Sequence, residues 1–357
     1  MHHHRFFFQP QRRLTIAMDW RMLVFLVWVT FFTVPVFSQD GYLQQQTIEL
    51  VPGWNAVYVE LDPSESDPSA LFAGTPVDVV ATFDSATKGA QYVENPDSGM
   101  LNSYGWAVWY APGRSDAFLT SLYGMLGSKP YLIHARTNAS IVISGTAAPR
   151  LFEWKPNAFN FVGFTVEQPG SPTFGQFFAG SPAHNHNKIY RLVEGVWRQI
   201  VSPAATSMRA GEAFWIYCDG RSDYPGPLEV TTRSTSLGVV LSSQSGSHID
   251  FRNRTQHPVA FTIEHVVDPA QPIPISVPVE VLDEEAGGLR STVHVHYDTG
   301  SFEQSFPSLE AGQAIRLPLS LRLQDAGPGE RHSLLKVVTD MGTITYLPVT
   351  ANRDDLP

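Results

Sequence analysis

Two pairs of histidines have the residue type and spacing that best suit metal binding. His294 and His296 lie two residues apart in an alternating apolar and polar stretch, so both are expected on one face of a strand. His184 and His186 lie in the polar segment Ala-His-Asn-His-Asn-Lys. Imidazole binds zinc and copper, but such a site needs a third ligand, and the sequence identifies none. A solvated strand face and a polar turn explain the two pairs equally well, so both interpretations stay open.

Trp106 and Tyr110 are the candidates for ligand binding. They lie four residues apart on one face of a predicted strand, and flat aromatic rings can stack on sugar rings. An extra segment near 86–107 leads into this strand and occurs in only one of two related units described below. Insertions of this kind often carry function. Core packing is the alternative, because large aromatic side chains dominate protein interiors.

No local motif for catalysis is present. The chain has no Gly-x-Ser-x-Gly elbow, His-Glu-x-x-His segment, phosphate-binding glycine loop or EF-hand spacing. Cys218 follows an apolar strand segment and has no identifiable neighbouring base, so we expect a buried, unreactive thiol. We therefore expect a protein that is not an enzyme and that has no cofactor. A glycan-active hydrolase or lyase is an alternative, since catalytic carboxylates leave no local motif.

The composition fits a sheet-rich protein with several domains. The 357 residues include 24 Lys and Arg against 34 Asp and Glu, which gives a net charge of −10. This charge argues against nucleic-acid binding, because phosphate neutralisation needs clustered basic residues. Charged residues are only 16% of the chain and aromatic residues 12%, a balance more typical of strands and turns than of helices. The single cysteine excludes an intramolecular disulfide and a zinc site with several thiolates.

Residues 1–38 have the pattern of a secretory signal peptide. Arg12, Arg13 and Arg21 supply the positive region, and residues 22–36 form an apolar stretch too short for a comfortable membrane span. Small residues at Val36 and Ser38 predict cleavage after Ser38. An uncleaved anchor is the alternative. With cleavage, the mature chain has no transmembrane span and acts in a secreted, periplasmic or cell-surface setting.

Four ordered matches indicate an internal duplication. The matched pairs are 53–61 with 158–166, 72–76 with 178–182, 80–84 with 188–192, and 126–133 with 209–216. A tryptophan, Trp109 or Trp197, follows the third match in each copy. The matched segments alternate like strands, and short helices are expected at 68–73 and 172–178. Asn55 and Asn160 occupy matching positions, where we expect their side chains to cap a turn.

These motifs resemble duplicated, poorly characterised all-β modules of secreted bacterial proteins. The resemblance rests on the opening Gly53-Trp-Asn55 and on the closing segments Lys129-Pro-Tyr131 and Glu212-Ala-Phe-Trp215. The second copy departs from it, because Ala158-Phe159 stands in place of Gly-Trp. The resemblance implies an extracellular or surface setting and transfers no catalytic residue.

After a polar stretch at 231–236, short alternating strands are predicted to the end of the chain. They are expected near 238–242, 248–253, 259–264, 272–281, 292–297, 315–323 and 343–349. Seven or eight such strands in about 115 residues predict an antiparallel, immunoglobulin-like β-sandwich. Pro272, Pro274 and Pro278 lack a backbone donor, so their strand is expected at a sheet edge.

The sequence thus predicts an all-β chain: two tandem related β-domains at 45–148 and 149–233, then an immunoglobulin-like β-sandwich at 237–350. We expect a non-enzymatic secreted or cell-surface protein with a structural or interaction role. Its partner would be an unidentified protein or glycan outside the cytoplasm. The alternatives are a carbohydrate-binding protein that uses Trp106 and Tyr110, and the glycan-active enzyme.

Overall fold

The computed structural model describes residues 43–83, 105–147, 152–185, 188–233, 238–242, 246–266, 273–283, 289–297 and 303–353. Within these ranges the chain is all-β with a few short helices, as predicted. Residues 40–357 form one compact unit. The predicted signal peptide, most of the segment near 86–107 and His186 lie outside the described residues. Among the described residues, the helices are too short to form a membrane-spanning segment.

The first repeat consists of two antiparallel sheets. The larger has the order β2 (Gly53–Val59), β6 (Lys129–Ala135), β4 (Val77–Phe83), β5 (Trp106–Tyr110). The smaller has the order β1 (Leu43–Leu50), β7 (Ala139–Ala147), β3 (Leu61–Pro63). A core that includes the fully buried Tyr131, Ile133 and Met125 packs between them. Helix α2 (Pro68–Leu71) begins at the Asp67 cap, as the 68–73 pattern predicts.

The second repeat has the same strand order as the first. Its sheet runs β8 (Ala158–Gly163), β11 (Ala213–Cys218), β9 (Ile189–Val193), β10 (Val196–Gln199), so in both sheets the last strand pairs with the first and second. Helix α3 (Phe174–Phe177) begins with a capping box between Thr173 and Gln176. A second core of buried aromatic and aliphatic side chains covers the outer face of this sheet.

Asn55 and Asn160 make matching hydrogen bonds, which confirms their predicted capping role. The Asn55 side chain accepts from the Val51 amide at 3.0 Å and donates to the Val51 carbonyl at 2.8 Å. Asn160 accepts from the Lys155 amide at 2.8 Å and donates to the Lys155 carbonyl at 3.1 Å. Each also donates to the carbonyl two residues before it. The asparagine therefore closes the turn that leads into the first strand of each sheet.

Strand pairing corrects two predicted correspondences between the repeats. Val80 corresponds to Ile189 rather than to Lys188, because they pair with the matched residues Ile133 and Ile216. The sequence matched Trp197 with Trp109, as the tryptophan that follows the third matched segment. In the structure Trp197 pairs with Leu192, and Trp106 pairs with Phe83. Leu192 and Phe83 occupy the same register position relative to the last strand of their sheets, β11 and β6. Trp106 is therefore the structural equivalent of Trp197. The sequence match failed because the two copies differ in length between these strands.

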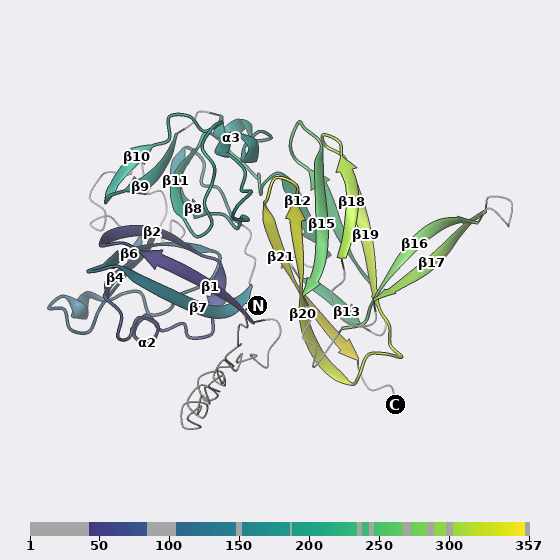
Figure 1. Cartoon of the computed structure of the whole chain (residues 1–357), viewed down its shortest axis with the longest axis horizontal. Coiled ribbons are helices and arrows are strands. Elements are labelled where there is room, and N and C mark those ends of the chain that lie inside the picture. The colour runs from purple at the N-terminus through teal and green to yellow at the C-terminus, as the bar shows by residue number, and fades with distance from the viewer. Residues whose placement is uncertain are drawn as a thin grey trace, which may run out of the picture. The chain divides into compact units, whose positions relative to one another are not determined.

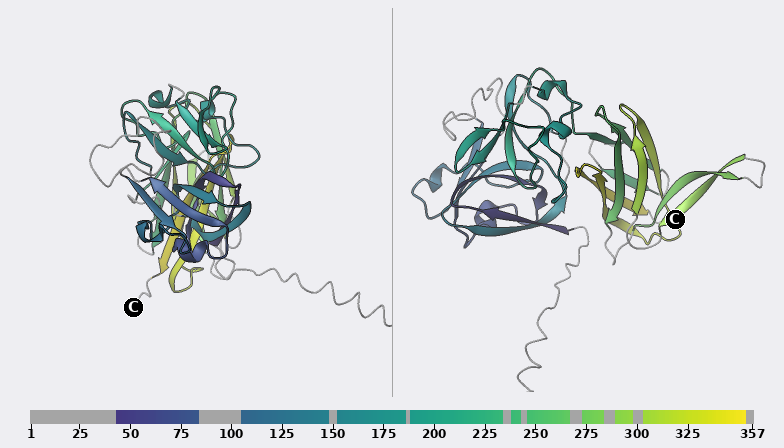
Figure 2. Two further views of the ribbon diagram at one scale, coloured as in Figure 1. Left: turned by 90° about the vertical axis from the view of Figure 1, so that its left-hand side faces the viewer. Right: turned by 45° about the horizontal axis from the view of Figure 1, so that its top comes forward.

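The four-stranded sheets of the two repeats pack face to face (Figure 2). Phe161 and Trp215 stack with ring centroids 4.9 Å apart at the centre of this interface. Phe83 of the first repeat contacts Trp215 at 5.5 Å, and Trp106 and Trp197 each lie 6.3 Å from it. The interface is built mainly from packed aromatic side chains, so the two repeats pack as a single body.

The C-terminal part is a sandwich of two five-stranded sheets. One has the order β12 (Leu228–Thr232), β14 (Ser247–Asn253), β19 (Ala314–Leu321), β16 (Ile275–Asp283), β17 (Leu289–Tyr297). The other has the order β13 (Val239–Ser242), β21 (Ile344–Arg353), β20 (Gly329–Thr339), β15 (Val259–Val266), β18 (Glu303–Leu309). Alternating side chains from both sheets fill one core. The pairing is antiparallel except between β13 and β21.

Several features of the sandwich differ from the sequence-based expectation. Strand β18 is not among the expected strands, and the β13–β21 pair is parallel rather than antiparallel. Strand β12 falls in the range assigned to the second repeat, yet it pairs with β14 and so belongs to the sandwich. The proline-containing strand β16 is not the sheet edge, because β17 lies outside it. However, β16 pairs with β19 only at Ile275 and Ser276, so Pro278 needs no donor on that side. Beyond this point β16 and β17 continue as a two-stranded ribbon, which projects in Figure 1.

Buried histidines are expected to make the fold acid-sensitive. Burial lowers the pKa of both His184 and His265 from 6.5 to about 4. The unfolded chain then binds more protons between these values, so their stabilising effect is complete above about pH 6.5 and is lost as the pH falls toward 4. Burial of Glu60 acts oppositely, because its pKa rises from 4.5 to about 7 and stability is lost as the pH rises through that window.

The His265→Gln variant tests this pH dependence. His265 is 2% exposed and bonds Ser333 through Nε2 at 2.7 Å. Between about pH 6.5 and 4.5, the wild type should lose about 2 kcal/mol more free energy of unfolding than the variant. Urea denaturation at both pH values measures the difference. Equal losses in the two proteins would show that His265 does not titrate on unfolding.

Candidate functional site

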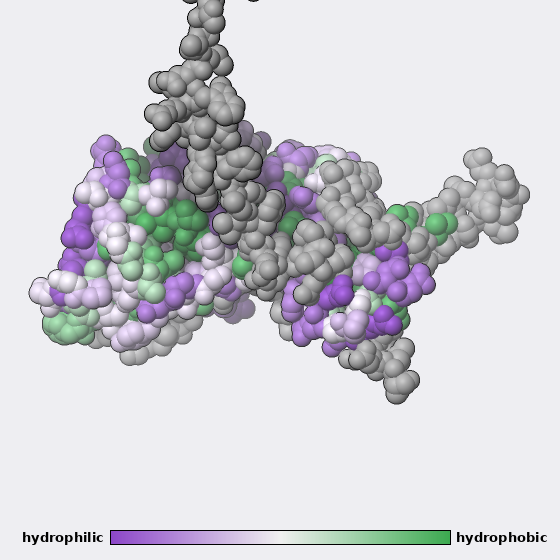
Figure 3. Space-filling view, turned by 60° about the horizontal axis from the view of Figure 1, so that its bottom comes forward, coloured by the Kyte–Doolittle hydropathy of each residue, from purple (hydrophilic) through white to green (hydrophobic). Residues whose placement is uncertain are grey.

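The segment 111–127, which links β5 to β6, exposes a group of large apolar side chains; we call it the presenting loop. Phe118 is 83% exposed, Tyr123 78% and Leu119 57%. Other exposed large apolar side chains of the described residues are scattered along the chain, whereas these three lie within six residues. Seen from below, apolar residues gather over the part of the surface that the first repeat forms (Figure 3).

Buried anchors hold the C-terminal half of the presenting loop. Leu122 and Met125 are 6% and 0% exposed and belong to the core of the first repeat. The Ser121 and Leu122 amides donate to the Val108 carbonyl at 2.7 and 3.0 Å. The Met125 amide donates to the Ser66 carbonyl at 2.8 Å. The loop therefore alternates between side chains that fix it and side chains that it displays.

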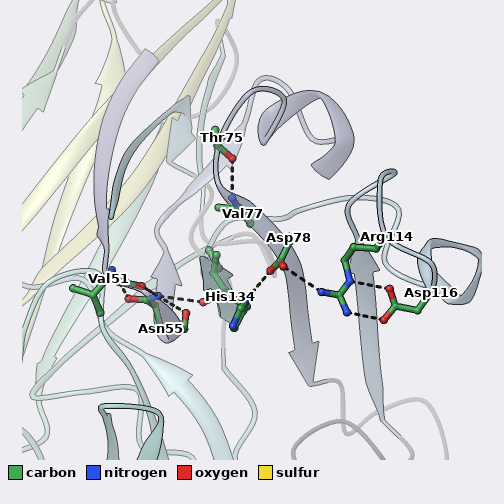
Figure 4. A network of polar contacts seen from close by, with 10 residues as sticks. Val51, Asn55, Thr75, Val77, Asp78, Arg114, Asp116 and His134 are labelled. Atoms are coloured by element: carbon green, nitrogen blue, oxygen red, sulfur yellow. Dashed lines mark hydrogen bonds and ion pairs between the residues drawn. The ribbon is translucent and has the colours of Figure 1, made fainter. Parts of the chain in front are cut away.

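A polar network holds the N-terminal half of the loop (Figure 4). The Arg114 guanidinium donates two hydrogen bonds to Asp116 at 2.8 and 2.7 Å, and a third to Asp78 on β4 at 3.1 Å. The other Asp78 oxygen lies 2.6 Å from Nδ1 of His134 on β6. Hydrogen bonding with Asp116 raises the pKa of Arg114, and the same bonds lower the pKa of Asp116. Both groups thus stay charged, and the loop is tied to two strands of the sheet.

The predicted ligand-binding aromatics lie on β5, at the base of the presenting loop. Trp106 is half-buried and faces the interface between the repeats, where its ring contacts Phe83 at 5.4 Å and Phe161 at 6.1 Å. Tyr110 is half-buried too, with the Arg114 guanidinium 5.6 Å from its ring centroid. These contacts give Trp106 a packing role and make Tyr110 part of the support of the loop.

The candidate metal ligands that the structure describes lie in two parts of the fold, His184 in the second repeat and His294 and His296 on β17 of the sandwich. His184 is 4% exposed in the core of the second repeat, 2.6 Å from the Ser181 hydroxyl and 4.1 Å between ring centroids from Trp154. His294 and His296 lie on β17, opposite Pro278 and Ser276. Within the described residues, no three His, Cys, Asp or Glu side chains lie close enough to hold a metal ion.

Cys218 is buried, as predicted. It is 0% exposed, and burial raises the pKa of its thiol to about 11. The Sγ atom donates to the Gly220 carbonyl at 3.3 Å. A thiol with a raised pKa has little thiolate at neutral pH, so it is a poor nucleophile.

Sequence reasoning missed the presenting loop. Periodicity does not mark it, because exposed and buried residues alternate irregularly between 117 and 126. The available signal was the pair Phe118-Leu119 beside a loop start at Pro112-Gly113, where polar residues would be expected. Apolar residues in a loop are either anchors or exposed, and the sequence alone does not separate the two.

Comparison with protein-family models gives no match, and neither does comparison with curated protein sequences. Among solved structures, PapD-like domain 7 of human CEP192 aligns at 11% identity and a TM-score of 0.22, over 37% of this chain and 87% of that one. The SafA pilin of Salmonella enterica in complex with the SafB chaperone aligns at 14% and 0.21, over 36% of this chain and only 56% of that one.

The CupB6 tip adhesin of Pseudomonas aeruginosa aligns over more of the sequence, 88% of this chain and 86% of that one. Its identity is 10% and its TM-score 0.18. At TM-scores this low, no function passes from these proteins to this chain.

Proposed function

We propose that the chain is a non-enzymatic surface or interaction protein that acts outside the cytoplasm and binds a protein partner through the presenting loop. The observation that carries this proposal is the exposure of Phe118, Leu119 and Tyr123 on a loop fixed at both ends. Exposed apolar patches on otherwise well-packed proteins commonly mark interaction surfaces.

The fixed geometry of the loop favours binding. Ordering a flexible loop on association costs free energy, and a loop already held by Arg114, Leu122 and Met125 avoids most of that cost. Tyrosine and phenylalanine bury large areas in few rotamers, and Tyr is enriched among residues that dominate binding energy. The Tyr123 hydroxyl donates to the Thr120 carbonyl at 2.8 Å, so its ring is already oriented.

The extracytoplasmic setting is supported by the sequence. A cleavable signal over residues 1–38 would export the chain, and the single cysteine means that no disulfide has to form afterwards. The duplicated repeats and the sandwich then act as the scaffold for the loop. On this proposal the repeats correspond to the ranges 45–148 and 149–233, apart from strand β12.

The double variant Phe118→Ser/Tyr123→Ser tests the proposal. The native chain is isolated from the extracytoplasmic fraction of its own organism. In size exclusion it should elute at an apparent mass above 39.5 kDa, which is the mass of the full-length monomer. The variant should run as the monomer, since loss of two such side chains weakens an interface by about a hundredfold or more. Val196→Ser/Val201→Ser, which removes two side chains that are 53% and 88% exposed on the second repeat, is the matched control.

A monomeric wild type would overturn the proposal. So would a complex that survives the loop variant, or one that both double variants abolish equally. Thermal denaturation should give the same midpoint for all three proteins, because each substitution lies at the surface.

A further inference from the structure

A cavity forms where the two repeats and the sandwich meet; we call it the junction cavity. Its volume is about 170 Å³, room for about ten water molecules or a small organic ligand. Residues that carry chemistry in its lining are Tyr58, Glu60, Trp154, Thr165, Tyr224 and Tyr346. No residue of the presenting loop lines it. The cavity is therefore a second candidate site, separate from the proposed protein-binding surface.

The position of Glu60 in the cavity is fixed by its backbone. Glu60 lies between β2 and β3, where the chain passes from one sheet of the first repeat to the other. The Gln46 side chain on β1 accepts from the Glu60 amide at 2.9 Å and donates to the Tyr58 carbonyl at 2.8 Å. The Tyr58 amide donates to the Gly211 carbonyl of the second repeat at 2.8 Å. Both residues are thus held at the seam between the repeats.

The wall beside Glu60 depends on a glycine. A Cβ atom on Gly163 would overlap the Tyr58 ring, so only glycine lets that ring pack against β8. The Tyr58 hydroxyl bonds the hydroxyls of Ser128 and Thr165. This packing orients the ring and hydroxyl groups around the carboxylate.

The sandwich closes the other side of the cavity. The Ile344 amide donates to the Thr165 carbonyl at 3.0 Å, and the Glu167 amide donates to the Gly342 carbonyl at 2.8 Å. These two bonds form a short antiparallel pairing between the second repeat and the turn before β21. They place Tyr346 opposite the first repeat, in the cavity lining.

Of the side chains that the structure describes, those that line the cavity carry negative but no positive charge. Among the described residues that line the cavity, Glu60 is the sole carboxylic acid, and there is no lysine, arginine or histidine. Burial raises the pKa of Glu60 to about 7. Burial, with the charge of Glu60 as a further cause, also raises the pKa of Tyr58 and of Tyr346 to about 12. The Glu60 carboxylate is half-buried and is hydrogen-bonded to the Gly211 backbone. Partial burial without a cationic neighbour in the cavity disfavours the charged form, and a cationic ligand would offset that cost.

We infer that the junction cavity binds a small organic cation, an ammonium group that carries apolar substituents. Glu60 supplies the countercharge. Tyr58, Trp154 and Tyr346 line the cavity and supply aromatic surface, which attracts such cations more strongly than it attracts neutral groups. An anion is disfavoured by the same carboxylate, and a neutral sugar gains nothing from its charge.

Calorimetric titration of the purified chain with choline tests this inference. The neutral isostere 3,3-dimethyl-1-butanol has the same shape without the charge, so it should bind at least about tenfold more weakly. Glu60→Gln should weaken choline binding by about tenfold or more, whereas the exposed Glu310→Gln should leave it unchanged. Phe118→Ser/Tyr123→Ser should also leave it unchanged, so failure here and failure of the proposed protein binding are distinguishable.

The wild type alone provides a second test. Choline affinity should rise between about pH 6 and pH 8 as Glu60 ionises. The other titratable groups in the lining are Tyr58, Tyr224 and Tyr346, which stay neutral in this range. Farther out, Glu167 and Glu264 act on Tyr346, Lys336 lies 3.9 Å from Glu167, and Arg254 acts on Tyr224. Binding of the neutral alcohol with equal affinity would overturn the inference. Absence of choline binding, or choline binding that Glu60→Gln does not weaken, would overturn it too.

Discussion

Replacing Trp215 with alanine is expected to lower the free energy of unfolding by about 4 kcal/mol. Trp215 is 2% exposed and lies at the centre of the interface between the repeats. Its ring contacts Phe161 within the second repeat and Phe83 of the first repeat. Alanine would leave a cavity that neither sheet can fill without moving against its own outer core. Urea denaturation followed by circular dichroism measures the loss.

Val201→Ala is the control for Trp215→Ala. Val201 is 88% exposed, so its truncation should change the free energy of unfolding by no more than about 0.5 kcal/mol. A loss of less than about 1 kcal/mol for Trp215→Ala would contradict the packed interface between the repeats. The proposed scaffold for the presenting loop would then be wrong as well.

Replacing Asn253 with alanine is expected to cost about 3 kcal/mol. Asn253 is 0% exposed and ends β14 of the sandwich. Its amide nitrogen donates to the carbonyls of His257 and Leu309 at 2.7 and 2.8 Å, and its oxygen accepts from the Thr255 amide and hydroxyl at 2.7 and 2.9 Å. Alanine would leave these buried partners without their hydrogen bonds. Thermal denaturation of the variant should show a clearly lower midpoint.

The exposed Asn138 provides the control for Asn253. Asn138→Ala should leave the midpoint nearly unchanged, since its side chain lies at the surface. Both asparagines stand in an Asn-x-Ser/Thr sequence, at 138–140 and 253–255. An Asn253→Ala protein as stable as the wild type would show that the Asn253 side chain does not hold the turn after β14.

Many strand positions and the two short helices could be predicted from the sequence because they depend on local signals, whereas β1, β7 and β18 were not predicted. The alternation at Val57, Val59 and Leu61 predicts a strand with these side chains on a buried face. The turn before Asn55 predicts where that strand begins. The matched segments could be found for the same reason, because two sheets with the same strand order need similar turns and caps. The order of the strands in each sheet was not predicted, since pairing depends on residues far apart in the sequence.

The candidate sites depend on contacts that no local pattern reports. The junction cavity combines Glu60, Thr165 and Tyr346, which are separated by more than a hundred residues at each step. Trp106 could be placed on a strand face, but which face was covered depended on the second repeat. His184 fits a polar turn in sequence, yet Trp154 packs over it and buries it.

Photo-crosslinking from the presenting loop tests most directly the claim that this loop binds a protein partner. A benzophenone amino acid placed at position 118 of the full chain, expressed in its own organism, should give a discrete protein adduct on irradiation. The same amino acid at position 201, which is equally exposed on the second repeat, should give none. A single adduct at 118 that Tyr123→Ser weakens is the result that protein binding through the loop predicts. No adduct at 118, or the same adduct from both positions, would contradict it.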